Sequence, residues 1–209
     1  MRLLPLLLLL PALAIAAPAG PPGPNAPLDE MGWLARDAQA SRLWYGSWLS
    51  IQTALTAAQL GLAFDVARVE PDLLPPQRGQ YRGRMLVGAG TAAIGLGAIA
   101  IAAPPTLGGV EALQRKINAG LLTPEQARLE ARRLLLRAGS AEQGARAILG
   151  HVGNFGLNFA AALVNSMVFK APDEAWGGFL LGITIGEAQI WTRPRAAWHA
   201  MRRLDLQDP

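Results

Sequence analysis

The 209-residue sequence contains no cysteine, and this absence excludes several kinds of chemistry at once. Disulfide bonds, thiolate metal sites, cysteine nucleophiles and lipoprotein anchors all need the thiol group. Charge is also scarce: lysine occurs twice, and only 16% of the residues are charged, against roughly 25% in soluble domains. Hydrophobic residues make up 51% of the chain. The length fits one domain, and the composition is typical of helices that face lipid.

The net charge of +4 comes almost entirely from arginine. A basic chain can bind nucleic acid or an anionic membrane surface. Here the arginines stand at the ends of apolar segments, where such side chains extend to lipid headgroups. No motif combines basic and aromatic residues as nucleic-acid binding requires. We therefore expect a lipid bilayer as a partner and no nucleic acid.

Residues 1–19 read as a signal peptide. Arg2 begins a short positive region, an apolar stretch follows, and Ala14-Ile15-Ala16 gives the small-x-small cleavage pattern. Two prolines make the apolar stretch a poor spanning helix, although an uncleaved anchor is the alternative. Residues 20–42 are expected to form a linker rich in proline and glycine, followed by a short surface helix.

Four apolar segments between residues 43 and 192 predict four transmembrane helices, at 43–64, 85–103, 147–169 and 175–192. Prolines in 65–84 favour an extended connection there. The polar loop 104–146 contains an amphipathic basic helix that we expect at the membrane interface. A basic tail, 193–209, ends the chain. The predicted fold class is thus all-α: an integral membrane bundle of four transmembrane helices after a signal peptide, with one interfacial amphipathic helix.

Two capping boxes predict where helices begin in the polar loop. The first, Thr123 to Gln126, opens the basic helix, which is expected to end at Gly139. That helix either contacts anionic lipid or is simply solvated. The second box, Ser140 to Gln143, predicts one long helix that runs unbroken to Phe169.

Polar and small residues predict how the first two spans pack. Gln52 and Gln59 lie on one helical face, which must point into the bundle because hydrocarbon offers no hydrogen-bond partner. Interhelical hydrogen bonding is the expected role, with a ligand-facing role as the alternative. In the second span, Ala89, Ala93 and Gly97 form a small-xxx-small ridge that would let another helix approach closely.

The last two spans carry the one candidate site. Asparagines and a histidine recur along one face of the third span, and Glu187 is the only carboxylate inside a predicted span. Counting outward from a turn at 170–175 places Glu187 opposite Asn158 and Trp191 opposite Asn154. His151 falls one turn further out, near Arg193, so either could supply positive charge. The candidate intramembrane polar site comprises His151, Asn154, Asn158, Glu187 and Gln189.

No metal, cofactor or enzyme motif accompanies these groups, and we expect neither a cofactor nor enzymatic activity. The stretch Gly186 to Pro194, preceded by His151-Val-Gly-Asn154, resembles a pattern in a group of uncharacterised, leader-bearing bacterial multi-span membrane proteins. The resemblance implies a multi-pass protein of the bacterial cell membrane and no mechanism.

Two functions follow as expectations. The first is a non-enzymatic structural or interaction component of the bacterial envelope, with a membrane-protein partner or a second copy of itself. The alternative is a small ion- or proton-responsive transporter or channel component that uses the intramembrane polar site. A carboxylate in a span is either a functional group or a paired group that fixes helix register.

The predicted leader and the distribution of positive charge indicate opposite orientations in the membrane. Thirteen arginines and lysines, including those of the loop and the tail, lie on one side of the predicted spans, and five lie on the other. The positive-inside rule places the thirteen in the cytoplasm. A leader followed by four spans places them outside, and this is the orientation we predict.

Overall fold

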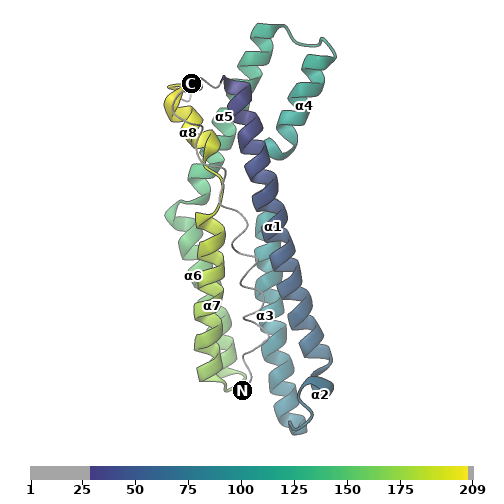
Figure 1. Cartoon of the computed structure of the whole chain (residues 1–209). Coiled ribbons are helices and arrows are strands. Elements are labelled where there is room, and N and C mark those ends of the chain that lie inside the picture. Colours follow the sequence, from purple (N-terminus) through teal and green to yellow (C-terminus); the bar gives the residue numbers. More distant parts are fainter. Residues whose placement is uncertain (1–28, 207–209) are drawn as a thin grey trace. The chain divides into compact units, whose positions relative to one another are not determined.

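The computed structural model describes residues 29–206, and the predicted leader, 1–19, lies outside that range. The described residues contain helices and no strand, so the prediction of an all-α fold is confirmed. In chain order the helices are α1 (Glu30–Phe64), α2 (Val66–Val69), α3 (Pro75–Ile101), α4 (Thr106–Asn118), α5 (Pro124–Ala145), α6 (Ile148–Met167), α7 (Pro172–Trp191) and α8 (Ala196–Arg203) (Figure 1).

The chain folds into two compact units that share helix α1. Within the described residues, unit 1 consists of 29–44, 104–144 and 192–206, and unit 2 of 45–103 and 145–191. The two units bury opposite kinds of residue, and each is described separately.

Unit 1 has the core of an ordinary helical domain. Large apolar side chains from α1, α4, α5 and α8 are buried together, among them Trp33, Leu34, Leu113, Leu134 and Leu135. Most charged side chains lie on the surface, where Arg42 pairs with Glu111 at 3.1 Å and the exposed Arg128 pairs with the partly buried Glu30 at 3.1 Å. Surface pairs of this kind add about 0–1 kcal/mol each, so burial of the apolar core stabilises this unit.

Unit 2 differs, because most of its large apolar side chains point outward; Trp48 and Ile99 are the large buried exceptions. The other buried residues are mostly small or amide-bearing: Gln52, Ala63, Val66, Ala89, Ala92, Asn158, Ala162 and Ala175. Its exposed residues are large and apolar, and include Leu86, Ile94, Phe155, Leu163, Trp176 and Leu180. Burial of these groups within the chain therefore cannot be what stabilises unit 2 in water.

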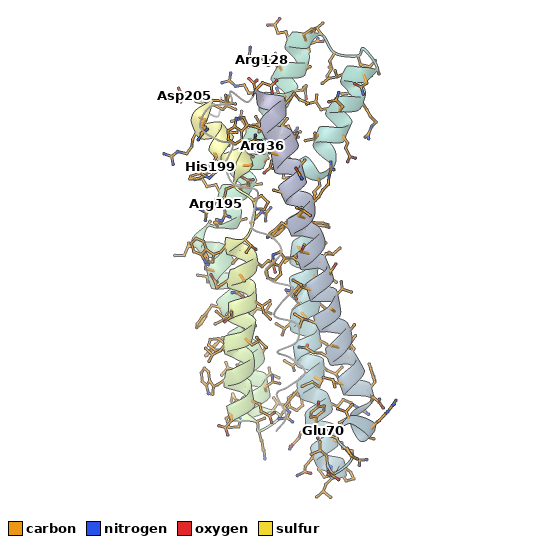
Figure 2. All side chains as sticks on the ribbon, in the orientation of Figure 1. Arg36, Glu70, Arg128, Arg195, His199 and Asp205 are labelled. Atoms are coloured by element: carbon orange, nitrogen blue, oxygen red, sulfur yellow. The ribbon has the colours of Figure 1, made fainter. Side chains whose placement is uncertain are left out.

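Helices pack in neighbouring pairs within unit 2. Helices α6 and α7 lie side by side and run antiparallel (Figure 1). The second half of α1 packs on α3, and the Arg82 side chain donates to the Ala63 carbonyl at 3.1 Å. The connection between α2 and α3 is polar and includes Glu70, which Figure 2 labels. Arg84 of α3 pairs with Glu174 of α7.

Two predicted boundaries near the start of unit 2 are wrong. The expected surface helix and the first span form one unbroken helix, α1, because nothing between Ser41 and Leu43 stops it. Helix α3 begins at Pro75, ten residues before the predicted span. Proline is tolerated in the first helical turn, where its missing N–H has no partner to lose, so Pro75 and Pro76 start the helix instead of preventing it.

The predicted stop at Gly139 is also wrong. Helix α5 continues through Gly139 to Ala145, so the second capping box lies inside it, and the chain bends by 45° before α6. A Cβ atom on Gly139 would collide with Met201 of α8. The glycine therefore permits close packing and does not end the helix. The first capping box is confirmed: Thr123 N donates to Gln126 Oε1 at 2.9 Å, and Gln126 N donates to Thr123 Oγ1 at 3.2 Å.

Within the described residues, one helical stretch, Pro75–Asn118, is long and apolar enough to cross a membrane. A second qualifies if α5 and α6 are taken together as one bent span. Only 17% of the most apolar window of the first stretch is buried, unlike the core helix of a soluble protein. The four predicted spans thus do not all meet this criterion.

Candidate functional site

The candidate site lies on the facing sides of α6 and α7. The turn between these helices occupies residues 168–171, where Lys170 adopts a φ of 51° and the Ala171 N–H donates to the Asn165 carbonyl at 3.2 Å. Asp173 and Glu174 stand in the first turn of α7, where acidic side chains interact favourably with the helix dipole.

Glu187 is held by donors on both of its oxygens. His151 Nδ1 lies 2.7 Å from Glu187 Oε2, and Asn154 Nδ2 donates to Glu187 Oε1 at 3.0 Å. The Trp191 side chain is a further hydrogen-bond partner of the carboxylate, and its ring lies 5.6 Å from the His151 ring. The side chains of His151 and Glu187 are 28% and 30% exposed, so the pair remains accessible from one side.

Two asparagines of α6 pack on two glycines of α7. Asn154 lies against Gly186 and Asn158 against Gly182, and a Cβ atom at either glycine would collide with the asparagine oxygen. Asn154 Nδ2 also donates to the Ile183 carbonyl at 3.2 Å, and Asn158 Nδ2 donates to Asn154 Oδ1 at 2.9 Å. The asparagines thus bridge the helices and extend the hydrogen-bond network away from Glu187.

The structure brings His151, Asn154 and Asn158 together with Glu187, but the predicted register is wrong. Glu187 contacts His151 and Asn154 and does not stand opposite Asn158. The turn at 168–171 has its midpoint three residues before that of the predicted turn. Each residue of α7 is therefore opposed by a residue of α6 nearer to its N-terminus. Arg193, expected near His151, belongs to unit 1 and lies 5.1 Å over the Trp44 ring.

Gln189 lies apart from this network. Its Oε1 accepts a hydrogen bond from Gln52 Nε2 of α1 at 3.4 Å. The predicted face of α1 therefore does point into unit 2, where its two glutamines contact glycines of α3. Gln52 lies against Gly95 and Gln59 against Gly88.

The predicted ridge on α3 does not make these contacts. Ala89 is buried, but Ala93 is exposed, and a Cβ atom at Gly97 would meet nothing within 4 Å. The position of α1 is set by the two glutamine side chains, which need the space beside Gly88 and Gly95. A small-xxx-small ridge of alanine and glycine does not by itself show which face of a helix another helix will contact.

One polar cluster was missed from the sequence. In unit 1, Asp37, Glu142 and Arg193 are buried together from parts of the chain that are far apart in sequence. Asp37 looked like a surface residue of a short helix, and Glu142 like part of a capping box. Residue spacing along the sequence does not predict contacts between α1, α5 and the segment before α8. The sequence alone therefore did not indicate this cluster.

The groups of the candidate site can form hydrogen bonds and exchange a proton. A structural metal centre needs three or four ligands, and the described residues contain no group of three or more suitable side chains. A histidine within hydrogen-bond distance of a carboxylate can share or exchange a proton. No protein-family model, curated protein or solved structure matches the chain.

Proposed function

We propose that the protein is a non-enzymatic integral component of the bacterial envelope that acts through contacts with lipid and with a partner protein or a second copy of itself. The observation that carries this proposal is the reversed burial in unit 2. Large apolar side chains such as Ile94, Phe155 and Leu180 face outward, while alanines and amides face inward.

A bilayer accounts for this arrangement because lipid tails solvate large apolar side chains at no cost. In lipid, helices associate through small residues and interhelical hydrogen bonds, as at the asparagine–glycine contacts of α6 and α7. In water, so many exposed large apolar side chains would be unusual, because soluble monomers rarely expose large apolar patches. Unit 1 has a conventional core and charged surface, which suit an aqueous or interfacial environment.

The order of the helices along the chain supports four spans, although some of these helices are only weakly apolar. Unit 2 is built from two segments of the chain, 45–103 and 145–191. The first contains the second half of α1 and α3, joined through the short helix α2, and the second contains α6 and α7, joined by a turn. A hairpin that enters a bilayer returns the chain to the face it left. Two hairpins would therefore leave all three segments of unit 1 on one side of the membrane.

The test uses the absence of cysteine. Single cysteines at Ser140 and Asp72, both exposed, are labelled in intact cells with a membrane-impermeant maleimide and compared with lysed cells. The proposal expects the two positions to label on opposite sides and the protein to resist extraction from membranes by alkaline carbonate. Labelling of Ser140 from outside supports the leader, and labelling only after lysis supports the positive-inside rule. Both positions on one side, or release by carbonate, would contradict the four spans.

One contact favours a second candidate function, an ion- or proton-responsive transporter or channel component. Glu187 lies within hydrogen-bond distance of His151 between α6 and α7, and such intramembrane pairs often mark ion or proton paths. This function expects pH-dependent flux in liposomes that Glu187→Gln abolishes. Flux that is the same in native and variant protein would remove the site from consideration and leave the structural role.

A further inference from the structure

Unit 1 contains a buried cluster of charged side chains in which two carboxyl oxygens have no hydrogen-bond donor. Asp37 of α1 is 1% exposed, Glu142 of α5 is 5% exposed, and Arg193 precedes α8. Ser41 and Thr106 complete the cluster with two hydroxyl groups, and both are buried. Buried charges are stable only when each is paired or fully hydrogen-bonded, so every oxygen here needs a partner.

The donors around the two carboxyl groups leave one oxygen of each without a partner. Asp37 Oδ2 accepts from the Thr106 hydroxyl at 2.6 Å and from the Ser41 hydroxyl at 3.4 Å. Glu142 Oε2 accepts from the Trp198 backbone N–H at 2.7 Å, in the first turn of α8, and the Ala197 backbone is a further hydrogen-bond partner of this carboxyl group. The other oxygens, Asp37 Oδ1 and Glu142 Oε1, are buried without a donor.

The two side chains are hydrogen-bond partners of each other, and a hydrogen bond between Asp37 Oδ1 and Glu142 Oε1 would satisfy both remaining oxygens. Two ionised carboxylates have no hydrogen to share and repel one another, whereas a single proton between them satisfies both oxygens. Burial, reinforced by the nearby Asp37, raises the pKa of Glu142 to about 10.

The local charge supports one shared proton. The Arg193 guanidinium lies close enough for Asp37 and Glu142 to oppose the lowering of its pKa by burial. With one proton, the pair carries a single negative charge that Arg193 balances; with none, one negative charge is left over. Two other cations on the packed elements lie on the surface: Arg42 pairs with the exposed Glu111, and His199 of α8 is exposed.

We propose that Asp37 and Glu142 form a proton-binding site, and that the bound proton allows the N-terminal turn of α8 to dock on Glu142 in folded unit 1. A metal cation is a poorer ligand because Arg193 already supplies positive charge there. A catalytic pair of carboxyl groups would need access for a substrate, and side chains 1% and 5% exposed give none. The site is independent of the membrane function proposed above.

A proton held only in the folded state makes stability depend on pH with a definite sign. The unfolded chain loses the Glu142 proton near the ordinary pKa of 4.5, while the folded chain holds it until about 10. Stability is therefore greatest in acid and falls as pH rises between these two values. The limit for one proton is a tenfold decrease in the folding equilibrium constant per pH unit.

The Glu142→Gln variant tests the site because an amide imitates the protonated carboxyl group. Its oxygen can accept from the Trp198 N–H, and its NH2 group can donate to Asp37 Oδ1. In unfolding titrations of the detergent-solubilised full chain between pH 6 and 9, we expect this variant to lose most of the native pH dependence and to exceed native stability at pH 8. Glu111→Gln, an exposed control on α4, should keep the native slope.

Infrared spectroscopy gives a second readout that does not depend on the variants folding equally well. The native protein should show the C=O band of a protonated carboxyl group at pH 8. The band should persist in Glu187→Gln and disappear in Glu142→Gln and in Asp37→Asn. The proposal is overturned if the native protein lacks the band, if Glu142→Gln retains it, or if that variant has the native pH slope.

Discussion

Asn154 of α6 occupies the space beside Gly186 of α7, where the Cβ atom of any other residue would overlap its oxygen. The same relationship recurs one turn away between Asn158 and Gly182, and again between the two glutamines of α1 and the glycines of α3. An amide therefore faces a glycine twice between α6 and α7 and twice between α1 and α3. This pairing allows close approach of helices and supplies hydrogen bonds where large apolar residues face outward.

The first prediction compares Gly186→Ala with Gly178→Ala. Alanine favours a helix over glycine by up to about 1 kcal/mol, and this gain is common to both variants. At Gly178 nothing lies within 4 Å of the new Cβ atom, so that variant should be unchanged or more stable. At Gly186 the overlap with Asn154 should lower the free energy of unfolding by about 1–3 kcal/mol. Denaturant unfolding in detergent micelles measures both, and equal effects would contradict the contact.

The polar face of α6 could be predicted from the sequence, but its partners on α7 could not. Periodicity places His151, Asn154 and Asn158 on one side of a helix whatever that side contacts. The register against Glu187 depends on where the turn begins, and helix ends are set by capping and packing as well as by composition. Because the turn lies three residues earlier than predicted, Glu187 contacts Asn154 instead of Asn158.

Helix continuity and unit 1 were harder to predict. Gly139 was expected to end a helix, because glycine often does so, but Met201 of α8 needs the space beside it. The Asp37–Glu142 contact joins α1 to α5, and no local pattern encodes a contact across about a hundred residues. Local propensity therefore indicated which segments are helical, and tertiary packing decided where they end and meet.

The second prediction separates the charge of Glu187 from its role as an acceptor. Glu187→Ala leaves His151 and Asn154 without their acceptor and should lower the free energy of unfolding by about 1–3 kcal/mol. Glu187→Gln keeps an acceptor oxygen and should cost less. The two variants are compared by thermal unfolding in the same detergent. If Glu187→Gln proves as destabilising as Glu187→Ala, the negative charge itself holds the hairpin together.

The third prediction concerns the hydrogen bond between Gln52 and Gln189, which joins α1 to α7. A double-mutant cycle with leucine at both positions should give a coupling free energy of about 0.6 kcal/mol, the average for polar contacts between membrane helices. The cycle between Gln59 and Gln189 is the control, because Gln59 contacts Gly88 instead. Coupling of similar size in both cycles would mean that the effect spreads through the bundle and does not arise from the hydrogen bond.

The fourth prediction concerns Thr106, whose hydroxyl donates to Asp37 at 2.6 Å in the core of unit 1. Thr106→Val keeps the shape but leaves a buried carboxylate without its short donor, which should cost about 1–3 kcal/mol. Thr106→Ser keeps the donor and should cost less. Thr91→Val is the matched control, since the Thr91 hydroxyl donates only to the Val87 carbonyl of its own helix. Chemical unfolding at pH 7 measures all three variants. A Thr106→Val variant as stable as Thr91→Val would show that Asp37 does not depend on this donor.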